Sequence, residues 1–136
     1  MRSNLRSPSE QAEAAREPFA ALMDTWVGNA IMVLLVRQII LQPLPGETAT
    51  SRLKQIGMMT LIFALHGSEN PITLSTLVSM SGLTRGGVSE TIDQLVRREL
   101  LFETMGHNVI GRGRARLFVI SPGVLRKAYS ITDGEL

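Results

Sequence analysis

One face of the stretch 84–98 carries polar side chains whose types and spacing suit contacts with a nucleic acid. Its candidate contacts are Arg85, Gly86, Ser89, Glu90, Gln94, Arg97 and Arg98. The arginines can donate to a guanine edge or to phosphate oxygens, and Ser89 and Gln94 can hydrogen-bond to bases or to the backbone. Thr91 has similar chemistry but lies near the boundary with the buried face. We therefore expect this face to contact the edges of base pairs.

Glycines and acids on this face leave its interpretation open. Gly86 and Gly87 would let the first turn of a helix approach a phosphate, or they only avoid a clash with the preceding helix. Glu90 and Asp93 would repel phosphate. They must therefore face cytosine amines, pair with Arg97 or point away from the nucleic-acid backbone.

A second group of candidates lies in the stretch 104–127, which holds five basic residues and no acidic one. Its candidate contacts are His107, Asn108, Arg112, Arg114 and Arg116. The three arginines alternate, so an extended chain places them on one side. A narrow minor groove of DNA concentrates negative potential and attracts arginine. The alternative is a solvated hairpin that uses charge to prevent edge pairing.

The composition favours one small domain and gives no support to an enzyme. The chain has 136 residues, is 44% hydrophobic and 19% charged, and carries a net charge of +2, which suits a domain with a core and an extension. It has no cysteine, which excludes a disulfide framework and is compatible with a reducing cytoplasm. The two histidines have no nucleophile or carboxylate at motif spacing. We expect no catalytic residue, no metal and no cofactor.

We also expect a cytoplasmic protein without a signal peptide or a membrane span. The first residues of the chain are not followed by an uninterrupted apolar segment of the kind that a signal peptide contains. The apolar run 30–41 is interrupted by Arg37 and Gln38. It is also shorter than the roughly 20 residues that cross a bilayer.

The elements that position both groups are predicted from apolar spacing and from capping residues. Thr73 caps a short helix, Gly82 supplies a tight turn, and Thr84 caps the amphipathic helix 84–98. Two strands follow, 100–104 and 116–120, on either side of a glycine-rich tip, and Ser121 with Pro122 begins a last helix. The predicted fold class is mainly α with a small β-hairpin, in the order helix, turn, helix, hairpin.

The first half of the chain is predicted to be helical. The segment 1–17 is an arm, flexible or with a short helix capped by Ser9, and 18–70 is a helical dimerisation region. A long helix is predicted over 18–42. Beyond Ala30 it becomes apolar nearly all round, so it is covered by the fold or by a second subunit. The next helix is capped by Thr50 or Ser51 and ends at His66. The candidate interface residues are Phe19, Leu22, Trp26, Ile31, Leu34, Leu35 and Ile39.

The stretch 72–122 resembles the DNA-binding lobe of MarR-type (multiple-antibiotic-resistance) transcriptional regulators. The matching segments are TLSTLVSMSGL, TRGGVSETIDQLVRRELL and LFVISP. The resemblance implies a winged helix-turn-helix over 71–130, followed by a tail over 131–136. Arg114 matches the arginine of the family's Asp-x-Arg wing element, whereas Arg112 stands where the family has aspartate. Only about 15 residues follow Ser121, so the N-terminal helices would supply most of a dimer interface.

The leading hypothesis is a homodimeric regulator, expected to be a repressor, that binds double-stranded DNA at a pseudo-palindromic operator. Trp26 and the methionines would line a pocket for a small-molecule effector or, as is more usual for such residues, form core. An alternative is a winged-helix protein-interaction module, to which the acidic residues Glu90, Asp93, Glu99 and Glu103 would be suited. A third is a plasmid or phage replication or partition factor.

Overall fold

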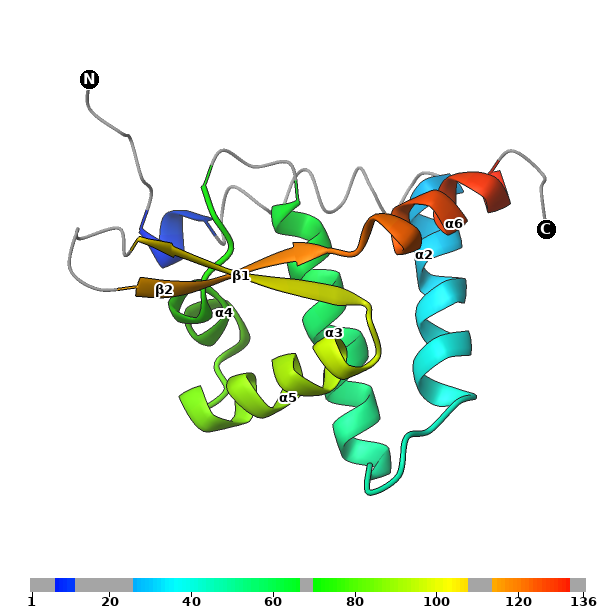
Figure 1. Cartoon of the computed structure of the whole chain (residues 1–136), viewed down its shortest axis with the longest axis horizontal. Helices are drawn as coiled ribbons and strands as arrows, with labels where there is room; N and C mark the ends of the chain where they lie inside the picture. The colour runs from blue at the N-terminus through cyan, green and yellow to red at the C-terminus, as the bar shows by residue number, and fades with distance from the viewer. Residues whose placement is uncertain (1–6, 12–25, 67–69, 108–113, 133–136) are drawn as a thin grey trace.

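In the computed structural model, residues 7–11, 26–66, 70–107 and 114–132 are described (Figure 1). These residues form a mainly helical structure with one two-stranded antiparallel hairpin, as the sequence predicts. The predictions for four residues lie outside the described residues: Phe19, Leu22, Asn108 and Arg112. For Trp26, His107 and Arg114 only the backbone is described.

The first helical turn, over residues 8–11, begins at Ser7 and not at the predicted Ser9. The backbone N–H of Glu10 donates to Ser7 Oγ at 3.2 Å, and the N–H of Ser7 donates to the Glu10 carboxylate at 3.0 Å. This reciprocal pair is a capping box, which needs a side chain that can accept a hydrogen bond three residues after the cap. Ser7 has Glu10 at that spacing, whereas Ser9 has an alanine.

Helix α2 (Trp26–Leu35) continues into the π-helical turn η1 (Val36–Ile40), and helix α3 spans Ala49–Leu65. The cap of α3 is Thr48, not the predicted Thr50 or Ser51. Thr48 Oγ1 accepts from the N–H of Ser51 at 3.0 Å, and Ser51 Oγ accepts from the N–H of Thr48 at 3.1 Å. Ser51 is thus the second residue of a capping box and not the cap itself. Because several hydroxyl residues lie within four positions, the sequence does not show which of them caps the helix.

Helices α4 (Leu74–Ser81) and α5 (Arg85–Arg97) begin where the sequence predicts. Thr73 Oγ1 accepts from the N–H of Thr76 at 3.2 Å, and Thr84 Oγ1 accepts from the N–H of Gly87 at 3.0 Å. Between the helices, Gly82 has a φ of 72°, the left-handed conformation that glycine adopts without strain. The short connection and the two caps therefore determine where α5 begins relative to the end of α4.

The hairpin is longer than predicted. Strand β1 spans Leu101–His107 and strand β2 spans Arg114–Ile120, so part of the predicted tip is paired β structure. Gly106 pairs with Ala115 in this extension. A Cβ on Gly106 would lie 2.4 Å from a methyl of Leu117. The glycine that indicated a turn is therefore a position of close packing.

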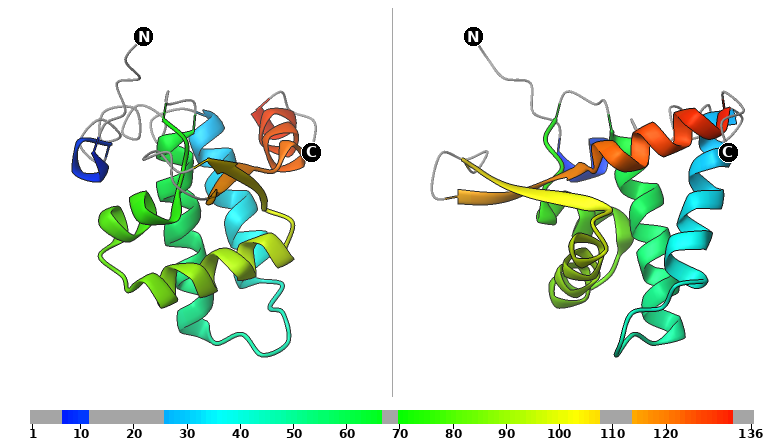
Figure 2. Two further views of the ribbon diagram at one scale, coloured as in Figure 1. Left: turned by 60° about the vertical axis from the view of Figure 1, so that its left-hand side comes forward. Right: turned by 45° about the vertical axis from the view of Figure 1, so that its right-hand side comes forward.

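The helices and the hairpin enclose one core. Helix α6 (Pro122–Thr132) packs against α2, and α5 packs against both α3 and β1 (Figures 1 and 2). The segment before α4 lies beside β2, since the N–H of Phe118 donates to the carbonyl of Ile72 at 3.1 Å. Buried side chains from every one of these elements meet in the core.

Four of the predicted interface residues belong to this core. Ile31, Leu34, Leu35 and Ile39 are each at most 7% exposed in the single chain. The apolar side chains that this helix leaves exposed include Val33 and Val36. Periodicity could not separate the two faces because the segment is apolar nearly all round. The four residues are therefore not the side chains that α2 and η1 present to a partner.

The turn after α5 holds a residue other than glycine in the left-handed conformation. Glu99 has a φ of 61°. Its N–H donates to the carbonyl of Val96 at 2.9 Å, and the N–H of Leu100 donates to that of Leu95 at 3.0 Å. This is a Schellman motif, in which glycine usually occupies the position of Glu99.

We expect Glu99→Gly to stabilise the protein by about 0.5 to 1 kcal/mol, because it removes the steric cost of a left-handed side chain. Urea denaturation measures the difference. The matched control is Glu90→Gly in the middle of α5, which should cost about 1 kcal/mol. A destabilised Glu99→Gly would contradict the conformation described for this turn.

Candidate functional site

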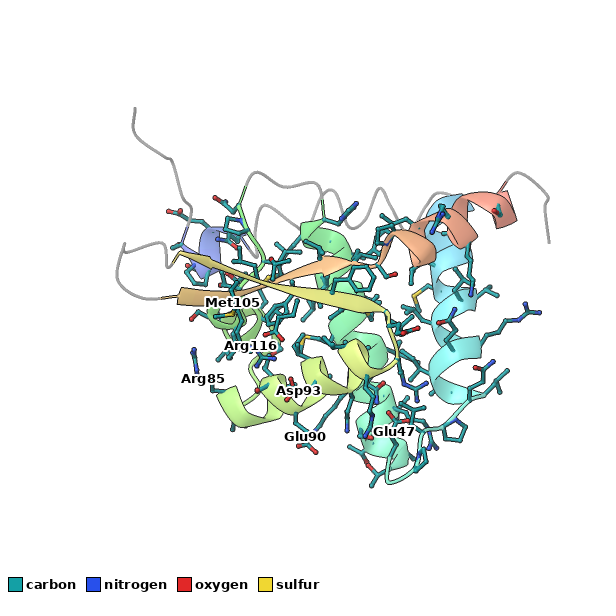
Figure 3. The ribbon with its side chains drawn as sticks, viewed as in Figure 1. Glu47, Arg85, Glu90, Asp93, Met105 and Arg116 are labelled. Atoms are coloured by element: carbon teal, nitrogen blue, oxygen red, sulfur yellow. The ribbon has the colours of Figure 1, made fainter. Side chains whose placement is uncertain are left out.

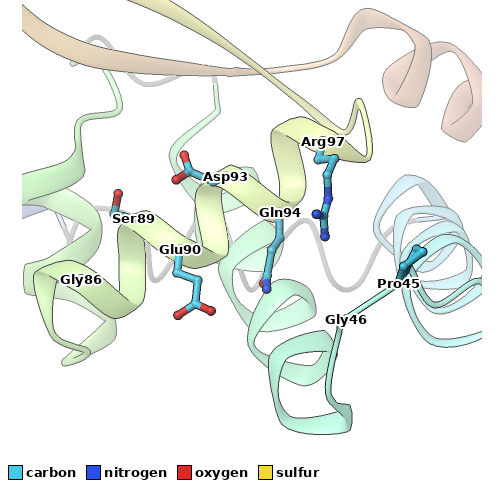
Figure 4. A pocket seen from close by; sticks show the side chains of 8 residues that line it. All are labelled: Pro45, Gly46, Gly86, Ser89, Glu90, Asp93, Gln94 and Arg97. Carbon is cyan, nitrogen blue, oxygen red and sulfur yellow. The ribbon is translucent and has the colours of Figure 1, made fainter.

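An open groove of about 650 Å³ runs along the outer face of α5 (Figure 4). It is lined by Pro45, Gly46, Gly86, Ser89, Glu90, Asp93, Gln94 and Arg97. The lining from α5 contains five residues that the sequence predicts as contacts and also Asp93, and the loop before α3 closes one end. We call the six α5 residues of this lining the outer face of α5.

Arg85 extends this face at the first turn of α5, where it is exposed and projects outward (Figure 3). Thr91 does not belong to the face, because it is 2% exposed and its hydroxyl donates to the carbonyl of Gly87 at 2.9 Å. The position near the boundary that the sequence indicated is therefore a core position.

The two glycines of α5 differ in their surroundings. Among the described residues, a Cβ on Gly86 would meet no atom within 4 Å, so their packing does not require a glycine there. A Cβ on Gly87 would lie 3.1 Å from Thr84 Oγ1, the atom that caps the helix. No described atom of α4 lies near either glycine, so a clash with α4 does not explain why these positions are glycine. Packing in the described structure therefore does not explain Gly86, and its open side faces the groove.

Arg116 joins the hairpin to α5. Its Nη1 donates to Ser89 Oγ at 3.0 Å, its Nη2 to Asp93 Oδ1 at 2.8 Å, and its Nε to the carboxylate of Glu103. The guanidinium also lies 5.3 Å from the centre of the Phe118 ring. The hydrogen bond to Glu103 raises the pKa of Arg116, burial opposes this, and the pair with Asp93 adds to it.

This arrangement changes two interpretations drawn from the sequence. Asp93 pairs with Arg116 and not with Arg97. Arg116 is 28% exposed at its side chain and already has two carboxylate partners, so its charge is largely neutralised before any phosphate approaches. The main role of Arg116 is to hold the hairpin beside α5. Arg114 lies two residues earlier on β2, with its backbone paired to that of His107.

Arg98 is a structural residue and not a phosphate contact, which corrects its assignment to the DNA-binding set. Its side chain is 4% exposed and forms an ion pair with Glu47, whose side chain is 0% exposed. It also donates to the carbonyls of Gln42 at 2.9 Å, Ile39 at 3.4 Å and Gln38. The guanidinium thus binds backbone carbonyls at the end of η1 and just after it, and so joins α5 to η1.

Gln55 completes this buried cluster and was missed by sequence reasoning. It is 0% exposed, accepts from Arg98 Nε at 2.7 Å and donates to Glu47 Oε2 at 2.6 Å. A signal for it existed, since an amide among the apolar residues of α3 needs a buried partner. Its partners come from segments 8 and 43 residues away. No local spacing rule connects them.

The charge of Glu47 is stabilised by its neighbours. Burial is the largest influence and favours the neutral acid, but the N–H of Leu44, the amide of Gln55 and the guanidinium of Arg98 all favour the carboxylate. Together they hold the pKa of Glu47 below its ordinary value. The carboxylate therefore stabilises the folded chain above the unfolded-state pKa of about 4.3. This contribution is lost as pH falls through the lower folded-state pKa.

We expect Glu47→Gln to cost about 3 kcal/mol near pH 7, because it leaves Arg98 buried without its carboxylate. The difference from the wild type should shrink as the pH falls below the unfolded-state pKa of about 4.3 and through the lower folded-state pKa of Glu47, because the wild-type carboxylate then also becomes neutral. Urea denaturation at several pH values measures it, and Glu90→Gln, at an exposed carboxylate, is the control. A difference that is constant with pH would contradict the role assigned to the charge.

No protein-family model, curated protein or solved structure matches the chain. Among the helices in the described parts of the chain, none is long and apolar enough to cross a membrane. The features of this chain that bear on function are therefore the geometry of α5, of the hairpin and of the loop before α3.

Proposed function

We propose that the chain is a winged helix-turn-helix protein that binds double-stranded DNA and regulates transcription. The observation that carries the proposal is the outer face of α5, which is polar and open, whereas Val88, Ile92 and Leu95 on the opposite face are buried. A helix of this kind fits the major groove, which is about 12 Å wide. Helix α4 and the turn at Gly82 would set its angle, as in other helix-turn-helix proteins.

The side chains divide into two tasks. Arg85 and Arg97, at the two ends of α5, would bind phosphates or a guanine edge, and Ser89 and Gln94 would contact bases. Glu90 would face a cytosine amine. The hairpin would act as a wing, held against α5 by Arg116, and Arg114 at the start of β2 would approach the neighbouring minor groove. The MarR-type resemblance of the sequence supports the same assignment.

A homodimer on a pseudo-palindromic site remains part of the proposal. Two copies of α5 would then enter successive major grooves, about 10 base pairs apart. Val33 and Val36 are exposed apolar residues of α2 and η1, at 49% and 41%, on the side away from the core. Repression, rather than activation, is the expected outcome when such a dimer covers a promoter.

We expect Arg85→Ala to lower DNA affinity about tenfold and to reduce the slope of log affinity against log salt by about 1. The probe is a duplex selected from a random pool, titrated by fluorescence anisotropy at several salt concentrations. Arg126→Ala is the matched control, since Arg126 is an exposed arginine on α6, which lies away from α5 (Figures 1 and 2). Equal losses in the two variants would argue against binding through α5.

We expect Gly86→Ala to separate folding from binding. Open space around Gly86 means that alanine should raise stability by up to about 1 kcal/mol. If the first turn of α5 approaches a phosphate, the added methyl should lower DNA affinity about fivefold. Thermal unfolding and anisotropy titration give the two quantities. A variant that gains stability and keeps full affinity would show that Gly86 does not approach the DNA.

A second candidate is a winged-helix protein-interaction module. The favouring observation is that Arg98 and Arg116 are both paired with carboxylates, so the chain offers phosphate fewer free cations than its sequence indicates. Glu90 would then belong to the contact with a protein partner. The salt titration distinguishes the two candidates. An interaction module would show no salt-dependent affinity for the selected duplex and would not bind that duplex more tightly than random DNA.

A further inference from the structure

The orientation of the Gln55 amide is determined by two neighbours of fixed polarity. The Arg98 Nε–H can only donate, so the atom 2.7 Å from it must be the amide oxygen. The carboxylate of Glu47 accepts hydrogen bonds, so the atom 2.6 Å from its Oε2 must be the amide nitrogen. Both constraints give the same orientation. Because Gln55 is 0% exposed, water does not compete for either position.

The second hydrogen of the Gln55 amide reaches the outer face of α5. Gln55 Nε2 lies 3.3 Å from Gln94 Oε1, across the contact between α3 and α5. Because Arg98 and Glu47 fix the Gln55 amide nitrogen as the donor, Gln94 must present its oxygen to Gln55. Its own amide nitrogen, which has only hydrogens to offer, is then the group left for the groove (Figure 4).

We infer that Gln55 is a specificity-determining positioning residue, which makes Gln94 a hydrogen-bond donor toward the bound base. This inference rests on the proposed function. A free glutamine pairs with adenine through both its oxygen and its nitrogen, which the bond from Gln55 prevents or weakens. A donor alone suits a base whose major-groove edge offers acceptors, as guanine does through O6 and N7 and thymine through O4. Cytosine, which presents an amine, is disfavoured.

The chain offers a variant that reverses this polarity while conserving its composition. The double change Glu47→Gln and Gln55→Glu keeps the net charge, the side-chain volumes and a carboxylate beside Arg98. The residue at position 47 would then donate to position 55. Gln94 would have to present its nitrogen to the new carboxylate and its oxygen to the groove. The preferred base should change to one that donates, cytosine or adenine.

The first measurement concerns the free protein and does not depend on DNA. Hydrogen exchange of side-chain amides in the ¹⁵N-labelled chain should be about tenfold slower for Gln55 than for the exposed Gln42. Gln94→Ala should accelerate exchange of the Gln55 amide. An exchange rate that Gln94→Ala leaves unchanged would overturn the link between the two glutamines, whether or not the protein binds DNA.

The second measurement compares binding to duplexes that carry each base pair in turn at every position of a selected site. In the wild type, one position should prefer guanine or thymine over cytosine by about tenfold. The double variant should reverse that preference at this position alone. Gln55→Met, which releases the oxygen of Gln94, should instead raise the relative affinity for adenine about fivefold. Gln42→Met is the matched control and should change nothing.

The outcomes separate the two proposals. A wild type with a clear site whose base profile is unchanged in both the double variant and Gln55→Met would overturn the role of Gln55 and leave DNA binding standing. A wild type that binds selected and random duplexes equally would overturn the proposed function and the base preference with it. Thermal unfolding of each variant shows whether it folds. If either the double variant or Gln55→Met fails to fold, the base profile of the other one tests the role of Gln55.

Discussion

The placement of α5 against η1, α3 and the loop between them depends on one buried guanidinium. Arg98 ends α5, and its donors bind the carboxylate of Glu47, the amide of Gln55 and the carbonyls at the end of η1. A buried cation without these partners would cost several kcal/mol. The cluster therefore fixes the C-terminal end of α5 against both N-terminal helices and the loop between them. The outer face of α5 is presented at a set angle as a result.

A second ion cluster holds the same helix from the other side. Arg116 on β2 bonds Ser89 and Asp93 of α5, and its partner Glu103 comes from β1. This cluster is partly exposed, so it contributes less to stability than the Arg98 cluster does. Together the two clusters hold α5 in place, so that its outer face and the loop before α3 line the groove. They also pair Arg98 and Arg116 with carboxylates, although the sequence predicts both arginines as DNA contacts.

Local chemistry accounts for most of what the sequence predicts correctly. The caps Thr73 and Thr84 and the turn glycine Gly82 act within three or four residues, so their spacing suffices to identify them. Errors arise where two local solutions compete, as at Thr48 and Ser51, or where pairing between strands decides. Gly106 indicates a turn in isolation, yet its partner across the hairpin extends the strand.

The sequence by itself determined the order of the elements, the caps of α4 and α5 and the polar face of α5, because these follow from periodicity and from contacts a few residues apart. Only the tertiary structure decided which polar residues face a partner and which face one another. Arg98 and Arg97 are neighbours of the same type, yet one is buried beside Glu47 and the other lines the groove. The difference comes from Gln55 and Glu47, which lie more than 40 positions before Arg98 in the chain. Because these partners are distant in sequence, residue spacing does not reveal them.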